Sequence, residues 1–536
     1  MRLGRSHPLA RATRQLPPQS RAAVSTFFPD LVDPDTLRTL ALTGIDAARQ
    51  AGADYADIRI ADMHRFDMEQ FFMLFPLSEV SFEAAYGLHV QVGGGSAFVF
   101  GMDLTPDSIA RTARHAVEVA RGMARINPRR TEWMPAPVVR GEWTVPVEID
   151  PFTVSPNGHA EVLGACKEIA ERMPDTLADR LKFSWTRETR VFASTDGSLI
   201  TQRLMRSDPR IRVRAGSALA GAEARLDVPG FTTKNAGFES VSGAMLQERI
   251  KQTADEAVRL SRYPEAVADV NRYDAVMEGS VIGAILGATL AHALELGRAL
   301  GHEANGAGTS FLAPVGEILG TQIFSPHVTV NANVMTPAGQ GPKWDDEGVA
   351  IEPFPVIQQG CVVDYFATRE TTPELTSWYQ RRRQPVRLHG SAVAWTPALF
   401  PEGYASQLTM EPNPTGPSFE ALIKEISNGI VVWGVDDLYF DNGVKSDQQL
   451  SNGWLLPMGI YEVKRGQLVR RLIDGAVQFS TRRFFRGLTG VGGPATRRDS
   501  VHIGTRGEGG VPTTLPISTP AVHVAQLDVI SLKGGW

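Results

Sequence analysis

Histidines and carboxylates in the middle of the sequence are candidates for metal or acid–base chemistry. His292 and Glu295 are three residues apart in an apolar stretch that we expect to be helical, so they can face the same side. His302 lies ten residues beyond His292, which on a continuous helix means about 15 Å of rise and a different face. The two histidines can share a metal only if the helix breaks, and Gly301 permits a break. We expect a histidine with a structural role at position 292 and an exposed helix end at His302-Glu303. The alternative is a metal site that uses these residues.

A run of acids at Asp345-Asp346-Glu347 is the second candidate, because clustered carboxylates can bind a metal or transfer protons. The same composition is typical of a turn in which the acids accept backbone hydrogen bonds and Gly348 adopts positive φ. We expect such a turn, with a direct binding or catalytic role for the three acids as the alternative. Lys343 and Trp344 immediately before the run could line a cleft.

The elements that position these residues begin near Asp35, which can cap a helix of apolar periodicity ending at Gly52. A strand is expected at 55–60 and a further helix after Thr105-Pro106. Glycine turns predict two hairpins, one joining 87–92 to 97–100 and one joining 190–194 to 198–204. The first 34 residues are rich in arginine and lack the apolar core of a secretory signal, so we expect a disordered basic extension.

Composition changes near Tyr263-Pro264, after which strand and turn signals dominate. We therefore predict an α+β fold with a basic extension at 1–34, an α/β domain at 35–265 and a large β-rich domain at 266–536. The second domain is expected to be mainly antiparallel, with a long buried helix spanning His292.

Overall composition excludes several classes of protein. The formal charge of -5 over 536 residues gives no general attraction to nucleic acid, and Arg381-Arg382-Arg383 is interpreted as a solvated loop. Two cysteines exclude a disulfide framework, which fits a cytoplasmic protein. The longest apolar stretch, 281–294, is shorter than the roughly 20 residues that span a bilayer, so no membrane contact is expected.

Several segments, taken in order, resemble the TldD/PmbA family, whose members are also called modulators of DNA gyrase. The resemblance extends from about residue 36 to about 535 and implies a two-domain protomer with an N-terminal α/β region and a β-rich C-terminal domain. The segments that carry it are Ala51 to Arg59, Asp103 to Pro106, Gly308 to Phe311, Val315 to Glu317, Ser325 to His327, Asp345 to Gly348, Gly504 to Gly507, and Val511-Pro512.

The resemblance also implies a zinc site, and here the chain departs from the family pattern. Active TldD-like peptidases bind zinc with both histidines of a helical HExxxH and a later cysteine, and the glutamate acts as general base. Counted from Gly308, the two histidine positions hold Ala293 and Arg298, and the glutamate position holds Leu294. Arg506 stands at the cysteine position. We therefore expect no bound cofactor and no catalysis by this chain alone.

The resemblance then implies a non-catalytic, TldE-like subunit that pairs with a TldD-like homologue, or with a second copy of itself, to process peptides. Arg298 and Arg506 could bind a peptide carboxylate or an acidic loop in the vacated site. One alternative is an active metallopeptidase with ligands relocated to His292, Glu295, His302 and Glu303. The other is a peptide-binding scaffold unrelated to proteolysis. Nothing in the sequence supports an effect on gyrase.

Overall fold

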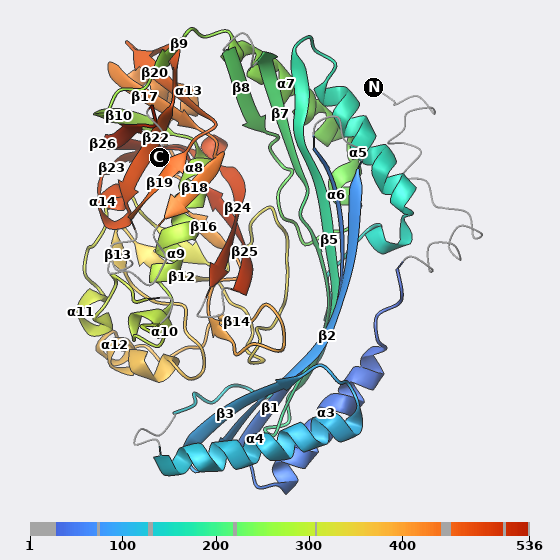
Figure 1. The fold of residues 1–536 in the computed structure, drawn as a ribbon. Coiled ribbons are helices and arrows are strands. Elements are labelled where there is room, and N and C mark those ends of the chain that lie inside the picture. Colours follow the sequence, from blue (N-terminus) through green and yellow to red (C-terminus); the bar gives the residue numbers. More distant parts are fainter. Residues whose placement is uncertain are drawn as a thin grey trace.

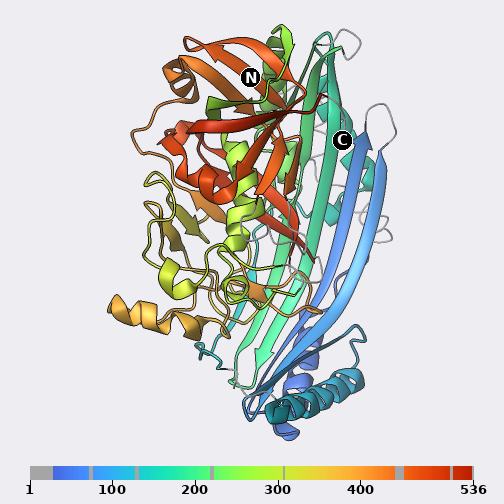
Figure 2. The same cartoon turned by 60° about the vertical axis from the view of Figure 1, so that its left-hand side comes forward.

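The computed structural model describes residues 28–71, 76–126, 132–217, 222–305, 308–440, 452–506 and 511–533. A long, bowed sheet carries helices on its outer side, and a β-rich unit lies against its inner side (Figures 1 and 2). Helix α7 (Ala244–Ser261) packs on the first sheet, and β9 (Glu265–Val267) already pairs with β21 of the β-rich unit. The predicted α+β class is confirmed.

Three long antiparallel strands, β1, β2 and β5, form the bow of the N-terminal sheet. Because side chains alternate along a strand, Ile58 and Ile60 of β1 pack under the helices, whereas Arg59 points to the inner side. Both predicted hairpins, β2–β3 and β5–β6, are confirmed. The strands of this sheet are β1 (Tyr55–Phe71), β2 (Leu77–Val92), β3 (Gly95–Gly101), β4 (Arg140–Thr144), β5 (Thr176–Ser194), β6 (Leu199–Ser207), β7 (Arg210–Ser217) and β8 (Ala222–Asp227).

Two groups of helices cover the outer side of the bow. α3 (Pro34–Gln50) and α4 (Pro106–Ile126) bury their apolar faces on one end of β1, β2 and β5. α5 (Pro156–Ala170) and α7 bury theirs on the other end, against β5, β7 and β8, together with the short α6 (Glu239–Ser242) and η1 (Pro151–Thr153). The N-terminal sheet therefore has two separate cores along its length.

The first helix has its N-cap two residues before the predicted one. Asp33, not Asp35, accepts a hydrogen bond from the backbone N–H of Thr36, and Pro34 occupies the first helical position. Phe28 is buried in an edge-to-face contact with Phe66, so residues 28–33 pack on the domain instead of extending from it. Residues 1–27 of the predicted extension lie outside the described residues.

The β-rich C-terminal unit contains a ten-stranded and a six-stranded sheet that share one core. Most pairs are antiparallel, as predicted, and the parallel pairs are β9–β21, β10–β17 and β16–β25. The larger sheet is built from β9, β10 (Asn271–Met277), β17 (Asn428–Trp433), β18 (Asp437–Phe440), β19 (Asn452–Leu456), β20 (Gly459–Lys464), β21 (Gln467–Ile473), β22 (Gly475–Ser480), β23 (Leu488–Val491) and β26 (Val522–Ser531).

The smaller sheet lies nearer the N-terminal strands, and a two-stranded ribbon, β14–β15, stands beside it. Its strands are β11 (Val330–Ala332), β12 (Phe354–Gln358), β13 (Cys361–Val362), β16 (Leu408–Met410), β24 (Arg498–Arg506) and β25 (Val511–Thr519), and the ribbon is β14 (Ala392–Val393) with β15 (Glu402–Gly403). Short helical turns in the connections are α11 (Val315–Ile318), η3 (Thr372–Leu375), α12 (Thr376–Arg381), α13 (Phe419–Glu425), α14 (Thr481–Arg486) and η5 (Pro494–Thr496).

A buried helix crosses this unit, but it is shorter than predicted. It runs through α8 (Gly279–Ile285), a π-helical turn η2 (Leu286–Leu290) and α9 (Ala291–Ala293), so His292 lies in its last turn. Beyond α9, the backbone of Phe366 pairs with the chain in place of the next helical turn. Its N–H donates to Leu294 O and its carbonyl accepts from Leu296 N. Glu295 is consequently extended, and α10 (Leu296–Ala299) starts anew. Pairing with a distant segment therefore ends the helix.

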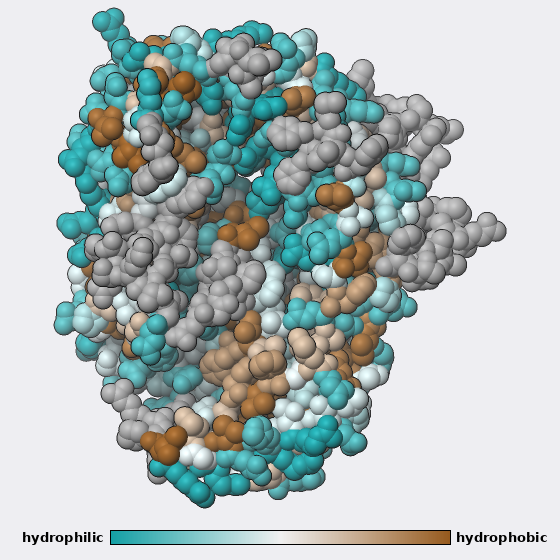
Figure 3. All heavy atoms as spheres, in the orientation of Figure 1, coloured by the Kyte–Doolittle hydropathy of each residue, from teal (hydrophilic) through white to brown (hydrophobic). Residues whose placement is uncertain are grey.

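No helix in the described part of the chain is both long enough and apolar enough to cross a membrane. In the view of Figure 3, hydrophilic residues cover much of the surface, and apolar residues gather near the lower end of the bowed sheet. Exposed apolar side chains of that sheet include Leu77 and Phe82 of β2 and Phe100 of β3.

Candidate functional site

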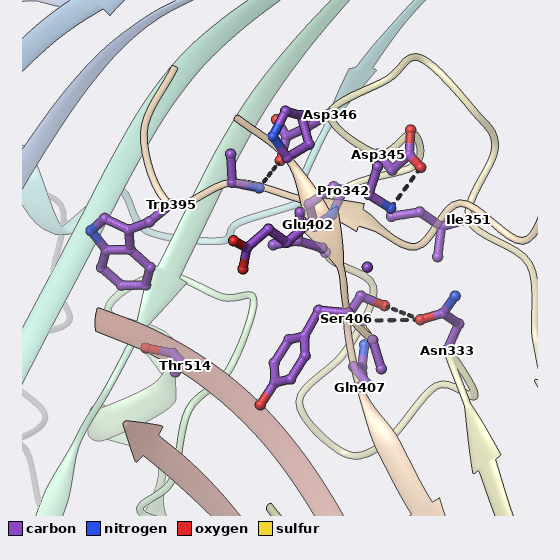
Figure 4. A pocket seen from close by; sticks show the side chains of 18 of the residues that line it. Asn333, Pro342, Asp345, Asp346, Ile351, Trp395, Glu402, Ser406, Gln407 and Thr514 are labelled. Carbon is purple, nitrogen blue, oxygen red and sulfur yellow. Dashed lines mark hydrogen bonds between the residues drawn. The ribbon is translucent and has the colours of Figure 1, made fainter. Parts of the chain in front are cut away.

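A cavity of about 770 Å³ lies between the inner side of the N-terminal sheet and the C-terminal unit. Met63 of β1, Arg190 of β5 and Met205 of β6 line one wall. The opposite wall comes from loops of the C-terminal unit, from the β14–β15 ribbon and from β25, and it presents Trp395, Glu402 and Thr514 around the open space (Figure 4). We call this cavity the interdomain cleft.

The break after α9 places Glu295 of the predicted His292–Glu295 pair at the wall of the cleft. His292 Nδ1 and Glu295 Oε1 are 2.9 Å apart, and both residues are buried. His502 of β24 lies edge-on to His292, with 5.9 Å between ring centroids. Burial, and then the nearby His292, lower the pKa of His502 to about 3, so this imidazole is neutral at physiological pH. The predicted pair therefore exists, and it packs on a second, neutral histidine that sequence reasoning missed.

Glu303 is not at an exposed helix end as predicted, since only 7% of it is exposed. It is buried because Arg298 reaches it, with 3.2 Å between Nη1 and Oε2. The same guanidinium donates from Nε to Thr309 O at 3.3 Å. His302, next to Glu303, is exposed and lines the cleft, so the prediction is wrong for the glutamate only.

Three carboxylates meet in the cleft. Glu295, Glu303 and Glu402 each offer an oxygen, and these oxygens lie within 4.8 Å of one another. Neither His292 nor His302 joins this group of described residues, so the alternative ligand set of His292, Glu295, His302 and Glu303 is not brought together as one group. Glu402 was missed, because it lies in a short ribbon strand about a hundred residues from the others and no local pattern marks it.

The acidic run forms the predicted turn. Asp345 Oδ1 accepts the backbone N–H groups of Glu347 and Val349 at 2.9 and 2.8 Å, and Gly348 has a φ of 76°. Asp345 Oδ2 accepts from Ala392 N at 2.9 Å and Asp346 Oδ2 accepts from Ala394 N at 2.8 Å, which ties the turn to β14 (Figure 4). We call residues 345–348 the acid turn; Asp345 and Asp346 line the cleft, as do Lys343 and Trp344.

Two arginines of the N-terminal sheet reach the acid turn from across the cleft. Arg190 Nη1 donates to Asp346 Oδ1 at 2.6 Å, and Arg59 Nη1 lies 3.6 Å from the same oxygen. Burial lowers the pKa of Arg59, although Asp346 opposes that shift. The sequence analysis singled out neither arginine. For Arg59, the available signal was a charged residue between the apolar Ile58 and Ile60 of a strand.

The sequence resemblance places the zinc-ligand positions of the family's active members at Ala293, Arg298 and Arg506, and the general-base position at Leu294. Ala293 and Leu294 are buried in the apolar core, and the carbonyl of Ala293 accepts from Ser310 Oγ. Arg298 occupies the second histidine position beside the cleft. Arg506 is the last residue of β24, and its side chain lies outside the described residues. Zinc in peptidases is bound mainly through imidazole or thiolate, whereas the nearby group of described residues has carboxylates only and sits beside a guanidinium, so the residues do not fit catalytic zinc.

Comparison with known proteins defines the class first. Residues 270–531 match the family model described as the PmbA/TldA metallopeptidase C-terminal domain. The whole fold is similar to that of a protein described as a modulator of a DNA gyrase from Thermotoga maritima, with a TM-score of 0.66 and 13% identity over 92% of this chain and 100% of that one. No curated protein matches the sequence.

Two further solved structures have the same fold. TldE from Thermococcus kodakarensis gives a TM-score of 0.64 at 13% identity, covering 92% of this chain and 100% of that one. A protein described as a modulator of DNA gyrase from Bacteroides thetaiotaomicron gives 0.61 at 14% identity, covering 92% and 98%. The family match of the C-terminal unit and the shared fold of the whole chain support membership of the TldD/PmbA family, as the sequence segments indicated.

Proposed function

We propose that this chain is a non-catalytic, TldE-like subunit that holds a peptide in its interdomain cleft while a zinc-binding homologue cleaves it. The observation that carries the proposal is Arg298, a buried guanidinium at the second histidine position, in contact with Glu303. A guanidinium has no lone pair for a metal and stays charged at neutral pH, so it repels zinc from this place.

The cleft has the size and the wall chemistry that suit a peptide segment. Its volume of about 770 Å³ is in the range of ligand sites. Met63, Met205 and Met335 supply adaptable apolar surface, and the backbone of the short ribbon β14–β15 lies at the wall. A TldE name is carried by one of the similar structures, which supports pairing with a TldD-like homologue.

Zinc content and peptidase activity test the proposal together. The purified chain should contain far less than one zinc per chain and should leave unstructured peptides intact. A homologue that carries HExxxH should cleave them when mixed with this chain, and a chelator should stop the reaction because the partner holds the zinc. Chelator-sensitive cleavage by this chain alone would overturn the proposal. Peptide binding without cleavage in any mixture would favour the scaffold alternative.

One observation favours a rival function. The oxygens of Glu295, Glu303 and Glu402 form an all-carboxylate group, which suits Mg²⁺, Mn²⁺ or Ca²⁺ better than zinc. An active enzyme with a relocated metal would then bind one such ion per chain. Equilibrium dialysis with Mn²⁺ and Ca²⁺ decides this point: stoichiometric binding that Glu303→Gln abolishes would establish the rival.

A further inference from the structure

The acid turn joins the two domains at the floor of the cleft. Gln202 of β6 donates from Nε2 to Trp344 O at 2.9 Å, and its Oε1 accepts from Lys343 N at 2.8 Å. Arg59 and Arg190 reach Asp346 from β1 and β5. The backbone just before the turn and the second acid within it are therefore fixed by the N-terminal sheet.

Glu347 connects to a second crossing between the domains. Its Oε2 accepts from the backbone N–H of Arg369 at 2.7 Å. The Arg369 guanidinium donates to Tyr55 Oη of β1 at 2.6 Å and to Met134 O at 2.8 Å. It also lies over the rings of Tyr55 and Trp133. Movement of Glu347 would therefore disturb the backbone of Arg369, whose side chain contacts Tyr55 of β1.

The buried side chains of Asp345 and Glu347 differ in how many hydrogen bonds stabilise their ionised forms. Burial raises the pKa of Asp345 to about 7, and the three backbone N–H groups that its carboxylate accepts oppose that shift. Glu347 accepts one, and its Oε1 has no hydrogen-bond partner among the described residues, although only 3% of the residue is exposed. A buried carboxylate with an unsatisfied oxygen costs far more than a neutral carboxyl group.

The charged groups that act on Glu347 come from three parts of the chain: Asp345 in its own turn, Asp57 and Arg59 of β1, and Arg369. The Tyr55 hydroxyl of β1 also lies within the electrostatic reach of Glu347. Two of these charges have partners of their own: His89 of β2 lies 3.2 Å from Asp57, and the Arg369 guanidinium lies 3.9 Å from Asp196. Burial, and then Asp345, raise the pKa of Glu347 well above its ordinary value of 4.5, and Arg369 opposes the shift.

We propose that the acid turn is a proton-held latch between the two domains: a proton on Glu347 keeps the turn closed, and loss of that proton drives the turn to rearrange toward the water of the cleft. Asp345 is the neighbour that repels an ionised Glu347, and the cleft is where water can solvate it. The latch does not depend on the peptide-binding proposal, because every contact that forms it lies within this chain.

One proton sets the size of the effect. If opening releases a single proton, the equilibrium between open and closed turn changes about tenfold per pH unit between the ordinary and the raised pKa of the carboxyl group. Amide hydrogen exchange measures this opening directly. Above about pH 7, where Asp345 is ionised, protection at 343–349, corrected for intrinsic exchange, should fall about tenfold per pH unit until Glu347 ionises in the closed turn. Protection in β10 of the C-terminal core should not follow it.

Matched variants separate the latch from a general effect of pH. Glu347→Gln keeps the shape and cannot ionise, so above about pH 7, where Asp345 is ionised, its protection at 343–349 should be independent of pH. Glu352→Gln, which changes an exposed carboxyl group five residues away, should behave as wild type. An unchanged slope in Glu347→Gln, a slope absent from the wild type, or equal slopes at 343–349 and in β10 would each overturn the latch. The wild-type comparison of the two segments decides the matter even if Glu347→Gln folds poorly.

Discussion

His159 shows at the residue scale how burial decides the charge of a side chain. It is fully buried among Phe66, Trp185 and Phe238, and its Nε2 lies 2.9 Å from Pro151 O. Burial lowers its pKa to about 4, although the bond to Pro151 opposes that shift. The ring is therefore a neutral donor at the centre of the second N-terminal core.

Acidification should destabilise the protein through this histidine. The unfolded chain binds a proton near the ordinary pKa of 6.5, whereas the folded chain resists it down to about 4. Stability should therefore be intact above about pH 6.5 and fall by about 1.4 kcal/mol per pH unit between about 6.5 and 4 for this group. Urea unfolding at a series of pH values measures the slope, which His159→Phe should reduce. His115→Phe, at an exposed position of α4, is the control, and equal slopes in both variants would contradict the assignment.

The acid turn should depend on Asp345 more than on any exposed acid. Asp345→Ala leaves three buried backbone N–H groups without acceptors, those of Glu347, Val349 and Ala392. Each costs about 1 kcal/mol or more, so a loss of at least about 3 kcal/mol in unfolding free energy is expected. Glu352→Ala on the exposed side should cost less than about 0.5 kcal/mol. A loss below about 1 kcal/mol for Asp345→Ala would show that the turn is held by its other contacts.

Residue types alone predicted some of these roles and not others. The acid turn was predictable because clustered acids followed by glycine form turns for local reasons, and Gly348 does adopt a positive φ. Glu303 was placed wrongly because its burial depends on Arg298, and Glu402 was invisible because its neighbours come from distant segments. Local chemistry is encoded near the residue, whereas a site assembled from several segments is not.

At the scale of elements, the buried helix packs so closely on β24 that it needs glycine. A Cβ at Gly283 would lie 2.1 Å from Ser500 Oγ, and one at Gly287 would lie 2.5 Å from the Cβ of His502. The two glycines are four residues apart, so they form one face of the helix. This close approach brings His502 beside His292.

Adding one methyl group on this face should therefore destabilise the C-terminal unit. Gly287→Ala forces the helix away from β24 and should cost about 1–3 kcal/mol, despite the better helix propensity of alanine. The matched control is Gly164→Ala in α5, where a Cβ meets nothing within 4 Å. That variant should gain about 0.5–1 kcal/mol. Thermal unfolding of both proteins tests the pair, and a neutral Gly287→Ala would mean that the helix can shift at no cost.

The same helix shows where sequence periodicity is no longer sufficient to predict the secondary structure. Strands β1, β2 and β5 and their hairpins follow from alternation and glycine turns, which are local. The helix was expected to continue past His292 to an end near His302-Glu303. It ends because Phe366 supplies the backbone partners of Leu294 and Leu296, and that pairing spans about seventy residues of sequence.

At the scale of the whole molecule, a fold shared at 13–14% identity with other members is held across its two domains by buried charge. Asp346 of the C-terminal unit is 4% exposed and accepts from Arg190 while lying near Arg59, which is 2% exposed. Arg59 also donates from Nη2 to Leu399 O, so its guanidinium contacts the C-terminal unit at both Asp346 and Leu399. Such a junction resists salt, because screening is weak where water is excluded.

Replacing Arg59 should weaken the junction without disturbing the cores. Arg59→Met keeps the side-chain volume but leaves Asp346 with one arginine, Arg190, in place of two and Leu399 O without the Arg59 donor, so a loss of about 3 kcal/mol is expected. Because the contact is buried, the loss should be the same at low salt and at about 1 M NaCl. Arg259→Met breaks an exposed pair with Glu256 on α7 and should cost less than about 1 kcal/mol, and that cost should vanish in high salt. Urea unfolding of the two variants at both salt concentrations tests the contrast, and a salt-sensitive loss for Arg59→Met would mean that water reaches the junction and that apolar contacts, not buried charge, hold the domains together.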